Sequence, residues 1–568
     1  MRVLTLAALA LVAACGVAGP APAQAADEPA RPKLVVLVFF DQLRGDYLER
    51  WKAQFGDGGF NRITTQGAWF ADCHYPYSYT VTAAGHSSVV TGCAPAEHGV
   101  VGNDWFERSV GKSVNCVGSD RHVQVPGRTA EGTDEDEKKG ATGGVSPDRS
   151  LKPTFADALK LGTGGKAKVV SLSLKNRGAA IPGGKNPDAC YWMDGGTGQF
   201  VTSTYYRDTL HPWVKEFNAA KPAERWRGRT WERLRSDLDY AKLVGPDDGS
   251  GEGRGAGQGR TFPHPFEPTD PKTKPAYFTA VFTSPFGNDL LLALAEKALD
   301  AEKLGTGDVP DLLALSFSSN DAVGHAWGPN SQEVLDVTLR SDLVMKRLLE
   351  VLDAKVGKGQ YVLAMTADHG VCPLPEFSKK EGKDAARVQP AVAAKVETFL
   401  ADKYGKQAGK WVEAISGPWV YLSAKALKAA DVKQSDVEQE LAAWLLKQPG
   451  VAATYTRTTL EQGVPASDAT GAMVARSFHP ARSGDVYFVL KPLHLSGAAT
   501  ATGTSHGTPH AYDTHVPLVV FGPGVVAGTR RERVTPLATA AILAQAAGVK
   551  PPAGATAGVP EKLFGAKK

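Results

Sequence analysis

The run Leu34-Val-Val-Leu-Val-Phe-Phe40 ends directly at Asp41, and this apolar stretch with its acidic end indicates the fold. Seven consecutive apolar residues, most of them β-branched or aromatic, are typical of a strand buried on both faces of a parallel sheet. A carboxylate that follows such a strand lies at the carboxyl end of the sheet, where α/β folds bind their ligands.

The same pattern recurs three times further along the chain. The runs are Val169 to Leu174 before Lys175, Leu312 to Phe317 before Asp321, and Tyr361 to Ala367 before Asp368. Helical patterns lie between the runs, most clearly over Val334 to Val356, where leucines recur near helical spacing. Alternating strands and helices predict an α/β sandwich whose largely parallel central sheet is flanked by helices.

The helical patterns over 381–480, notably Ala391 to Tyr404 and Asp436 to Leu446, have no comparable acidic strand ends. We therefore expect a cap inserted into the sheet domain, whose two parts are 27–380 and 481–568. The Gly-rich and charged stretches 129–150 and 244–260 are expected to be surface loops or insertions.

The first 26 residues have the pattern of a secretory signal, with Arg2, an apolar run and small residues before Asp27. We expect an exported protein, periplasmic or extracellular. The segment Val12-Ala-Ala-Cys15 also resembles a bacterial lipobox, so a lipid anchor at Cys15 and an outer-membrane lipoprotein are an open alternative. Elsewhere no apolar run approaches the length of about 20 residues that spans a bilayer.

The composition excludes few classes of partner but argues against two. The 64 basic and 60 acidic side chains give a formal net charge of +4, which favours neither nucleic acid nor an anionic membrane as an obligatory partner. We expect a monomer that acts on small molecules.

Five cysteines remain after removal of the signal. One or two disulfides are plausible in an oxidising compartment, and the pair Cys93–Cys116 is preferred because it is among the most local. None of the five has the paired spacing of a thiolate zinc site.

Carboxylate and imidazole side chains at the strand ends indicate a metal site. Asp321 and His325 are four residues apart, one helical turn if a helix follows the strand, and the pair Asp368-His369 follows another strand. Together with Asp41, this mixture of oxygen and nitrogen ligands suits zinc and other borderline metals. A single Asp of this kind is usually a helix cap or a turn residue, but several at successive strand ends are hard to explain that way.

The segment from Tyr79 to Gly92 offers candidate nucleophiles. Thr82 is the best placed, because it precedes a small-residue turn that would leave its hydroxyl exposed. Coordination to a cation would favour the alkoxide. The alternative is that Thr82 caps the helix that contains Ser87 to Val90.

The pattern Thr82-x-x-x-His86-Ser-x-x-x-Thr91-Gly92-x-x-Pro95-x-x-His98-Gly99-x-x-x-Asn103 resembles the nucleophile segment of the phosphodiesterase and nucleotide pyrophosphatase branch of the alkaline phosphatase superfamily. The resemblance continues through Asp321 to His325, Asp368-His369-Gly370 and His506-Gly507, in the expected order. It implies an alkaline phosphatase-like sandwich, two zinc ions and a phosphothreonine intermediate.

The resemblance also implies a role for each site residue. Four residues would hold the zinc ion that activates the nucleophile: Asp41, Thr82, Asp368 and His369. The second ion, held by Asp321, His325 and His506, would stabilise the leaving-group oxygen. Asn103 corresponds to the phosphate-binding Asn of the family.

Lys175-Asn176-Arg177 bears on the substrate. Lys-x-Arg after this strand is similar to the threonine-nucleophile bacterial alkaline phosphatases, whose two cations contact the dianionic phosphoryl group. A monoester carries more charge than a diester, so these cations favour phosphate monoesters. A solvated basic pair is the plain alternative for the two side chains. The functional alternatives are a phosphodiesterase or nucleotide pyrophosphatase on the same scaffold, and a non-catalytic protein that has kept the fold.

Two further patterns are treated as unrelated to the chemistry. Cys93-Ala-Pro95-Ala-Glu97 partly resembles the sulfatase signature, but Glu97 stands where that signature has Arg. His510 and His515 lie outside the His-Gly context of the family and are expected to be supporting or surface residues.

Overall fold

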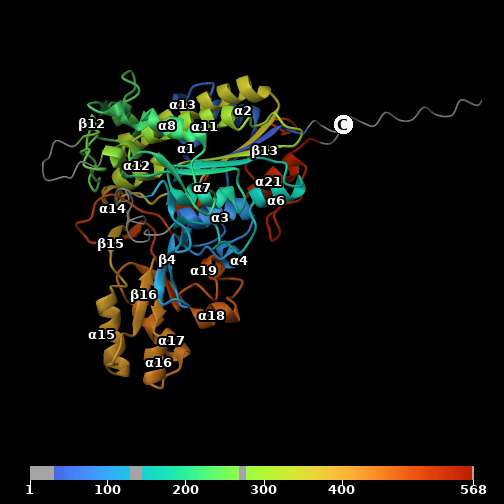
Figure 1. The fold of residues 1–568 in the computed structure, drawn as a ribbon. Coiled ribbons are helices and arrows are strands. Elements are labelled where there is room, and N and C mark those ends of the chain that lie inside the picture. The colour runs from blue at the N-terminus through green and yellow to red at the C-terminus, as the bar shows by residue number, and fades with distance from the viewer. Residues whose placement is uncertain (1–30, 128–143, 268–276, 566–568) are drawn as a thin grey trace, which may run out of the picture.

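A ten-stranded mixed sheet forms the centre of the molecule in a computed structural model that describes residues 31–127, 144–267 and 277–565 (Figure 1). The strands lie in the order β22 (Gly528–Arg530), β2 (Ala68–Phe70), β21 (Leu518–Phe521), β14 (Tyr361–Thr366), β1 (Leu34–Phe40), β13 (Asp311–Phe317), β8 (Val169–Ser173), β9 (Ala189–Met193), β10 (Phe200–Ser203) and β6 (Gln124–Val125). The five strands from β14 to β9 are parallel, whereas β21 and β10 pair antiparallel on either side of them. The predicted α/β sandwich with a largely parallel sheet is confirmed.

Helices cover both faces of this sheet (Figure 1). One layer contains α2 (Phe60–Gln66), α8 (Pro212–Ala219), α11 (Phe286–Ala301) and α13 (Gln332–Leu352), and the other contains α3 (Thr82–Thr91), α6 (Phe155–Gly162), α7 (Asn176–Gly183) and α21 (Ala538–Ala547). The predicted helix over Val334 to Val356 is confirmed as α13, which begins where Ser331 Oγ accepts the Val334 N–H at 3.1 Å.

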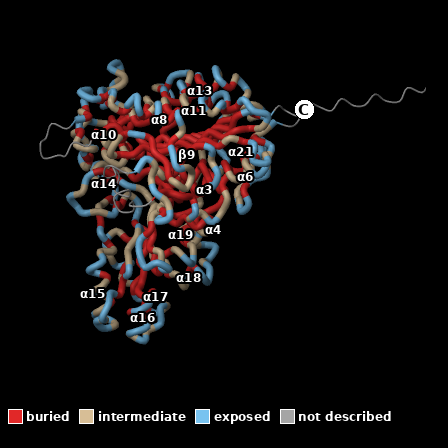
Figure 2. The backbone as a smooth tube through the Cα atoms, in the orientation of Figure 1, coloured by how far each residue is buried: buried red, intermediate tan, exposed pale blue. Residues whose placement is uncertain are grey.

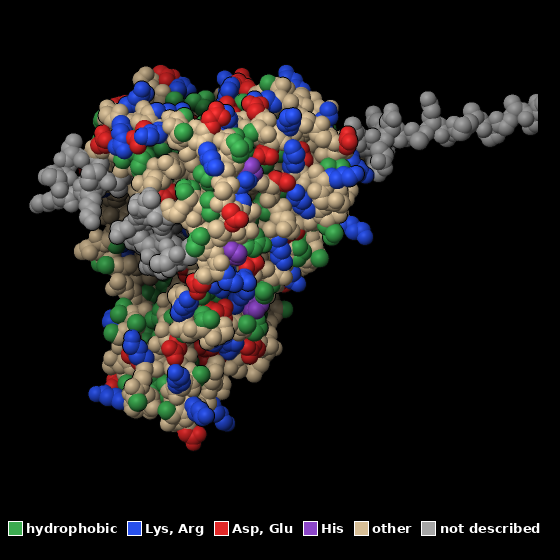
Figure 3. All heavy atoms as spheres, in the orientation of Figure 1, with side chains coloured by type: hydrophobic (Ala, Val, Ile, Leu, Met, Phe, Trp, Pro, Cys, Tyr) green, Lys and Arg blue, Asp and Glu red, His purple; other side chains and the backbone are tan. Residues whose placement is uncertain are grey.

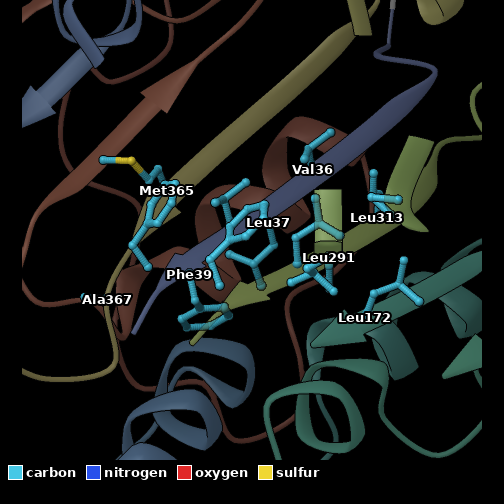
Figure 4. Packing of buried hydrophobic residues seen from close by; sticks show 14 of the residues in the cluster. Val36, Leu37, Phe39, Leu172, Leu291, Leu313, Met365 and Ala367 are labelled. Atoms are coloured by element: carbon cyan, nitrogen blue, oxygen red, sulfur yellow. The ribbon is translucent and has the colours of Figure 1, made fainter. Parts of the chain in front are cut away.

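The apolar runs of the four central strands pack between the two helical layers. Figure 4 shows Val36, Leu37 and Phe39 of β1 among side chains of neighbouring strands and Leu291 of α11. Each residue of β1 is at most 1% exposed, as expected for a strand with helices on both sides. The continuous hydrophobic pattern of these strands therefore has a direct structural cause.

A second, four-stranded sheet carries the region that projects from the main body (Figures 1 and 2). Its order is β16 (Val412–Ser416), β17 (Trp419–Leu422), β19 (Val486–Leu490) and β18 (Val451–Thr456). The helical patterns predicted for the cap correspond to α15 (Ala393–Tyr404) and α17 (Gln434–Leu446), which pack on this sheet around their own apolar cluster. The smaller sheet includes β19, which lies after residue 480, the predicted end of the cap. The domain limits at residues 380 and 480 stay predictions.

Three sequence predictions concern the signal segment 1–26 and the two predicted loops, 129–150 and 244–260. The signal segment 1–26, with Cys15, and most of the loop 129–150 lie outside the described residues. The stretch 244–260 consists of turns beyond the end of α9 (Tyr240–Val244), and its Gly253 N–H donates to Ala326 O at 2.7 Å. Across the described ranges, every helix is too short or too polar to cross a membrane.

The predicted disulfide Cys93–Cys116 is wrong. None of the five cysteines in the described part of the chain forms a disulfide, and each is buried. Cys93 follows α3 and its Sγ contacts Thr91 Oγ1 at 3.3 Å, whereas Cys116 follows β4 (Lys112–Asn115) and its Sγ lies 3.9 Å from Asn115 Oδ1. These thiols behave as small apolar side chains, so closeness in sequence did not bring the pair together.

Charged side chains of both signs are interspersed over the face of the body and cap shown in Figure 3. This distribution matches the near balance of 64 basic and 60 acidic residues. On this face the surface offers no large field of one sign that would select a polyanionic or polycationic partner.

Candidate metal centre and active site

Four strand ends place their polar side chains at one edge of the sheet. The strands β14, β1, β13 and β8 are neighbours and parallel, so the residues that follow them emerge side by side. Asp41 follows β1 directly, and its N–H donates to Phe317 O, the last carbonyl of β13, at 3.0 Å. Asp321, Asp368 and Lys175 follow the other three strands within four residues.

Two groups of side chains that could hold a metal ion lie at this edge. Asp41, Asp368 and His369 form one, and Asp321, His369 and His506 form the other; within each group the ligand atoms lie within 4.8 Å of one another. His325 joins the second group, because its Nε2 lies 3.2 Å from Asp321 Oδ1. The structure thus brings all six metal-binding Asp and His residues predicted from the sequence together, with His369 between the two groups.

The three histidines are held in the same way. Each places its Nδ1 at a backbone carbonyl: His325 at Thr504 O (2.8 Å), His369 at Gly370 O (2.9 Å) and His506 at Thr80 O (2.8 Å). A carbonyl oxygen only accepts hydrogen bonds, so Nδ1 carries the proton and Nε2 is left with a free lone pair. All three Nε2 atoms face the carboxylates, which is how imidazole ligands of a metal are oriented.

The buried carboxylates crowd one another. Asp41, Asp321 and Asp368 are each at most 4% exposed, and burial together with the charges of Asp321 and Asp368 raises the pKa of Asp41 well above its usual value. Asp41 Oδ1 and Asp368 Oδ2 have no hydrogen-bond partner among the described residues. Buried anions with unpaired oxygens are costly unless a cation approaches them, so the site fits metal ions.

Thr82 is the first residue of α3, and its hydroxyl points into this centre. Its Oγ1 lies 3.3 Å from His369 Nε2, and the side chain is 1% exposed. The next N–H, that of Ala83, donates to Asn103 Oδ1 at 2.9 Å. This bond fixes the amide of Asn103 with its oxygen toward the helix, so its NH₂ group is turned away from Ala83.

Lys175 lies between the two groups. Its Nζ donates to Asp41 Oδ2 at 2.8 Å and to Asp321 Oδ2 at 2.5 Å. Burial lowers the pKa of Lys175, but the negative charges of Asp321 and Asp41 raise it by more. The net shift is upward, so the ammonium form is maintained. Arg177, in the first turn of α7, is also buried at 4% exposure.

The chain matches the family described as type I phosphodiesterase / nucleotide pyrophosphatase over residues 35–510. This chain belongs to that family. It is 34% identical to the alkaline phosphatase PafA of Elizabethkingia meningoseptica over 90% of this chain and 91% of that protein. It is 33% identical to the alkaline phosphatase PhoV of Synechococcus elongatus, over 88% and 87% of the two chains. The crystal structure of wild-type PafA has a TM-score of 0.86 with 32% identity, covering 94% of this chain and 99% of PafA.

The resemblance to this phosphodiesterase family that the motifs indicated is thereby confirmed. The sulfatase-like Cys93 is fully buried behind α3 and belongs to neither group of ligands. His510 Nε2 contacts Leu490 O and His515 Nε2 contacts Ala71 O, each at 2.8 Å, so both rings are engaged elsewhere.

Sequence reasoning missed two residues of this phosphodiesterase-family site. His86 stacks on Phe39 and lies with Nδ1 2.9 Å from Thr82 O and 3.3 Å from Asp368 Oδ2, so it contacts both Thr82 and Asp368. Its place in the Thr82-x-x-x-His86 pattern was a usable signal. Gln42 contacts Asp368 of one group and Asp321 of the other. Nothing in the sequence marks this residue except its position directly after Asp41.

Proposed function

We propose that this chain is a zinc-dependent alkaline phosphatase that hydrolyses phosphate monoesters through a phosphothreonine intermediate. The observation that carries the proposal is the set of three histidines whose Nδ1 atoms are bound to carbonyls, so that every Nε2 faces the carboxylates beside Thr82. Both curated relatives described above are named alkaline phosphatases, which supports the same reaction class.

The donor set supports zinc as the metal. Three carboxylates and three imidazoles suit zinc better than calcium or magnesium, which prefer oxygen ligands alone. Asp41, Asp368 and His369 would hold one ion together with Thr82, and Asp321, His325 and His506 would hold the other. When bound, the two ions would supply the positive charge that activates the attacking hydroxyl and stabilises the leaving oxygen.

The protein's own groups hold the substrate and the nucleophile. Thr82 Oγ attacks the phosphorus, the bond to the leaving oxygen breaks, and the phosphoryl group is transferred to Thr82. Water then attacks the phosphothreonine, the bond between phosphorus and Thr82 Oγ breaks, and inorganic phosphate leaves with the Thr82 hydroxyl regenerated. The Asn103 NH₂, turned away from Ala83, donates to a non-bridging phosphoryl oxygen.

Lys175 and Arg177 favour the monoester over the diester. The Lys175 ammonium lies between carboxylates of both metal groups, so a phosphoryl group bound between those groups would lie near it. A monoester dianion gains more from this buried charge than a diester monoanion does. The alternative, a phosphodiesterase or nucleotide pyrophosphatase on this scaffold, requires these cations to serve another purpose.

The signal pattern of residues 1–26 supports an exported enzyme, periplasmic or extracellular, with lipid attachment at Cys15 as the alternative form. The intermixed surface charges in Figure 3 support small phosphate esters as substrates, without an obligatory nucleic acid partner. We expect the enzyme to act as a monomer.

The test compares a nitrophenyl phosphate monoester with the matching methyl diester. Purified protein is stripped with a chelator, shown to be inactive, and titrated with zinc. We expect activity to return with two zinc ions per chain and kcat/KM to be higher for the monoester. Full activity in excess chelator would refute metal dependence, and a preference for the diester would refute the substrate class.

A further inference from the structure

Gln42 contacts a carboxylate ligand from each of the two metal groups. Its backbone N–H donates to Asp368 Oδ1 at 3.1 Å, and its side-chain Nε2 donates to Asp321 Oδ1 at 2.5 Å. The residue is 3% exposed and directly follows Asp41, a ligand of the first group. One residue therefore borders three of the carboxylates of the centre.

The backbone at Gln42 adopts a conformation that this residue type rarely has. Its φ angle is +68°, in the left-handed region, and it is one of six described residues other than glycine with a positive φ. Left-handed backbone is unfavourable for a side chain with a Cβ, and glycine would adopt it freely. Contacts of the folded chain hold this conformation, and they include the hydrogen bonds of Gln42 to Asp368 and Asp321.

Helix α12 (Ser319–Trp327) leaves space for this side chain. The three atoms nearest to a Cβ built on Gly324 all belong to the Gln42 side chain, and its Oε1 would overlap with that Cβ. Gly324 lies between Asp321 and His325, two ligands of the second group. The absence of a side chain at Gly324 is thus what admits the amide to Asp321.

The chemistry of an amide suits this position. Its NH₂ group donates to a carboxylate without carrying a charge, so it orients Asp321 without competing as a cation for the same oxygen. The isosteric carboxylate of a glutamate has no such hydrogen and would repel Asp321.

We infer that Gln42 is a positioning residue that fixes the carboxylates of both metal groups, the backbone N–H acting on Asp368 and the side-chain amide acting on Asp321. This inference rests on the two-zinc function proposed above. The side-chain amide can be removed while the backbone N–H is retained, so the contribution of the amide can be measured by itself.

Gln42→Gly removes the amide and retains the N–H in a backbone conformation that glycine favours. We expect this variant to fold at least as stably as the wild type when both are free of zinc. In chelator-buffered zinc we expect one of the two ions to bind about 10- to 100-fold more weakly, the range typical for loss of a hydrogen-bonding partner of a ligand. The other ion should retain its affinity.

Gly324→Ala provides an independent route to the same defect. The new Cβ displaces the amide from Asp321, so the single variant should show the same weakened ion. In the Gln42→Gly background the space is empty, and Gly324→Ala should add less than a twofold further change. Gln42→Glu should weaken the same ion at least as much as Gln42→Gly. Gln66→Ala, an exposed glutamine in α2, is the control and should bind both ions as the wild type does.

The readout is zinc bound per chain as a function of free zinc, measured beside thermal denaturation of the zinc-free proteins. Wild-type protein that binds fewer than two ions would overturn the two-zinc proposal and this inference with it. Wild type and Gln42→Gly that both bind two ions with equal affinity would overturn the inference alone. Additive effects of Gln42→Gly and Gly324→Ala would also overturn it, because a shared cause cannot be lost twice.

Discussion

Replacement of Lys175 by methionine separates the charge of this side chain from its volume. Lys175 is 4% exposed, and its Nζ makes two charge-assisted hydrogen bonds, to Asp41 and Asp321. Methionine retains the apolar stem in the buried site and removes the ammonium. The change therefore tests whether the positive charge itself contributes to turnover.

The expected loss of kcat/KM follows from the free energy of a charge-assisted hydrogen bond made by the Lys175 ammonium. A hydrogen bond to a charged group contributes about 1.5–3 kcal/mol, which corresponds to roughly a 10- to 150-fold lower kcat/KM for a phosphate monoester. The matching diester carries one negative charge less and should lose less than about 10-fold. Removal of the ammonium also frees two carboxylate oxygens, so zinc should bind to the variant at least as tightly as to the wild type.

Steady-state kinetics on a nitrophenyl monoester and its methyl diester, with zinc content measured on the same samples, provides the assay. Lys168→Met is the matched control, because Lys168 precedes the opposite end of β8 and its Nζ donates to Glu302 O. We expect Lys168→Met to change both substrates equally and only slightly. Equal losses on the two substrates in fully zinc-loaded Lys175→Met would refute the argument from substrate charge.

Two further changes test the nucleophile and a buried acid remote from it. Thr82→Ala should abolish the trapped phosphoenzyme and lower kcat by more than about 100-fold while both zinc ions stay bound; ³²P label retained on the variant would exclude Thr82 as the nucleophile. Burial and the neighbouring Glu333 raise the pKa of Glu252 to about 8. The folded protein therefore favours the protonated form of Glu252. The stability that this form contributes is complete below the ordinary pKa of about 4.5 and is lost as the pH rises to 8. Glu252→Gln keeps an acceptor for the Gly249 N–H and should be more stable than the wild type by about 2–4 kcal/mol at pH 9, with no difference at pH 4.5; urea unfolding with a gap independent of pH would contradict this assignment.

The strand ends could be predicted because a buried strand appears in the sequence as an uninterrupted apolar run. A strand covered on both faces must be apolar throughout, and Asp41 and Asp368 break that pattern where their strands emerge from the sheet. Parallel neighbours then bring these ends together without further information. His506 follows no such run, since it lies in a long connection between β20 (His494–Ser496) and α20 (Ala511–Thr514), and its position was accessible only through the family motif.

The orientation of the ligands could not be predicted. His506 Nδ1 binds Thr80 O, 426 residues earlier in the chain. Every residue type has a backbone carbonyl, so the sequence does not show which carbonyl will bind the histidine. Gln42 is similar, because its function depends on a left-handed φ and on space at Gly324, which are properties of the folded chain. The cysteine prediction failed for the opposite reason: closeness in sequence was given weight although each thiol is accommodated as an apolar side chain in the core.

Contacts with the predicted cap also reach the segment that precedes Thr82, the proposed nucleophile. Ser477 Oγ, at the end of α19 (Ala469–Ser477), accepts the N–H groups of Ser78 and Tyr79 at 3.0 and 3.1 Å, and Tyr487 OH in β19 lies 2.8 Å from Ser78 Oγ. Thr80, two residues before Thr82, is held by its carbonyl to His506. The segment that precedes Thr82 is thus bonded on one side to the projecting region and on the other to a histidine of the second metal group. Because small displacements of a reacting atom cost large factors in rate, we expect the projecting region to contribute to catalysis by positioning Thr82, the proposed nucleophile.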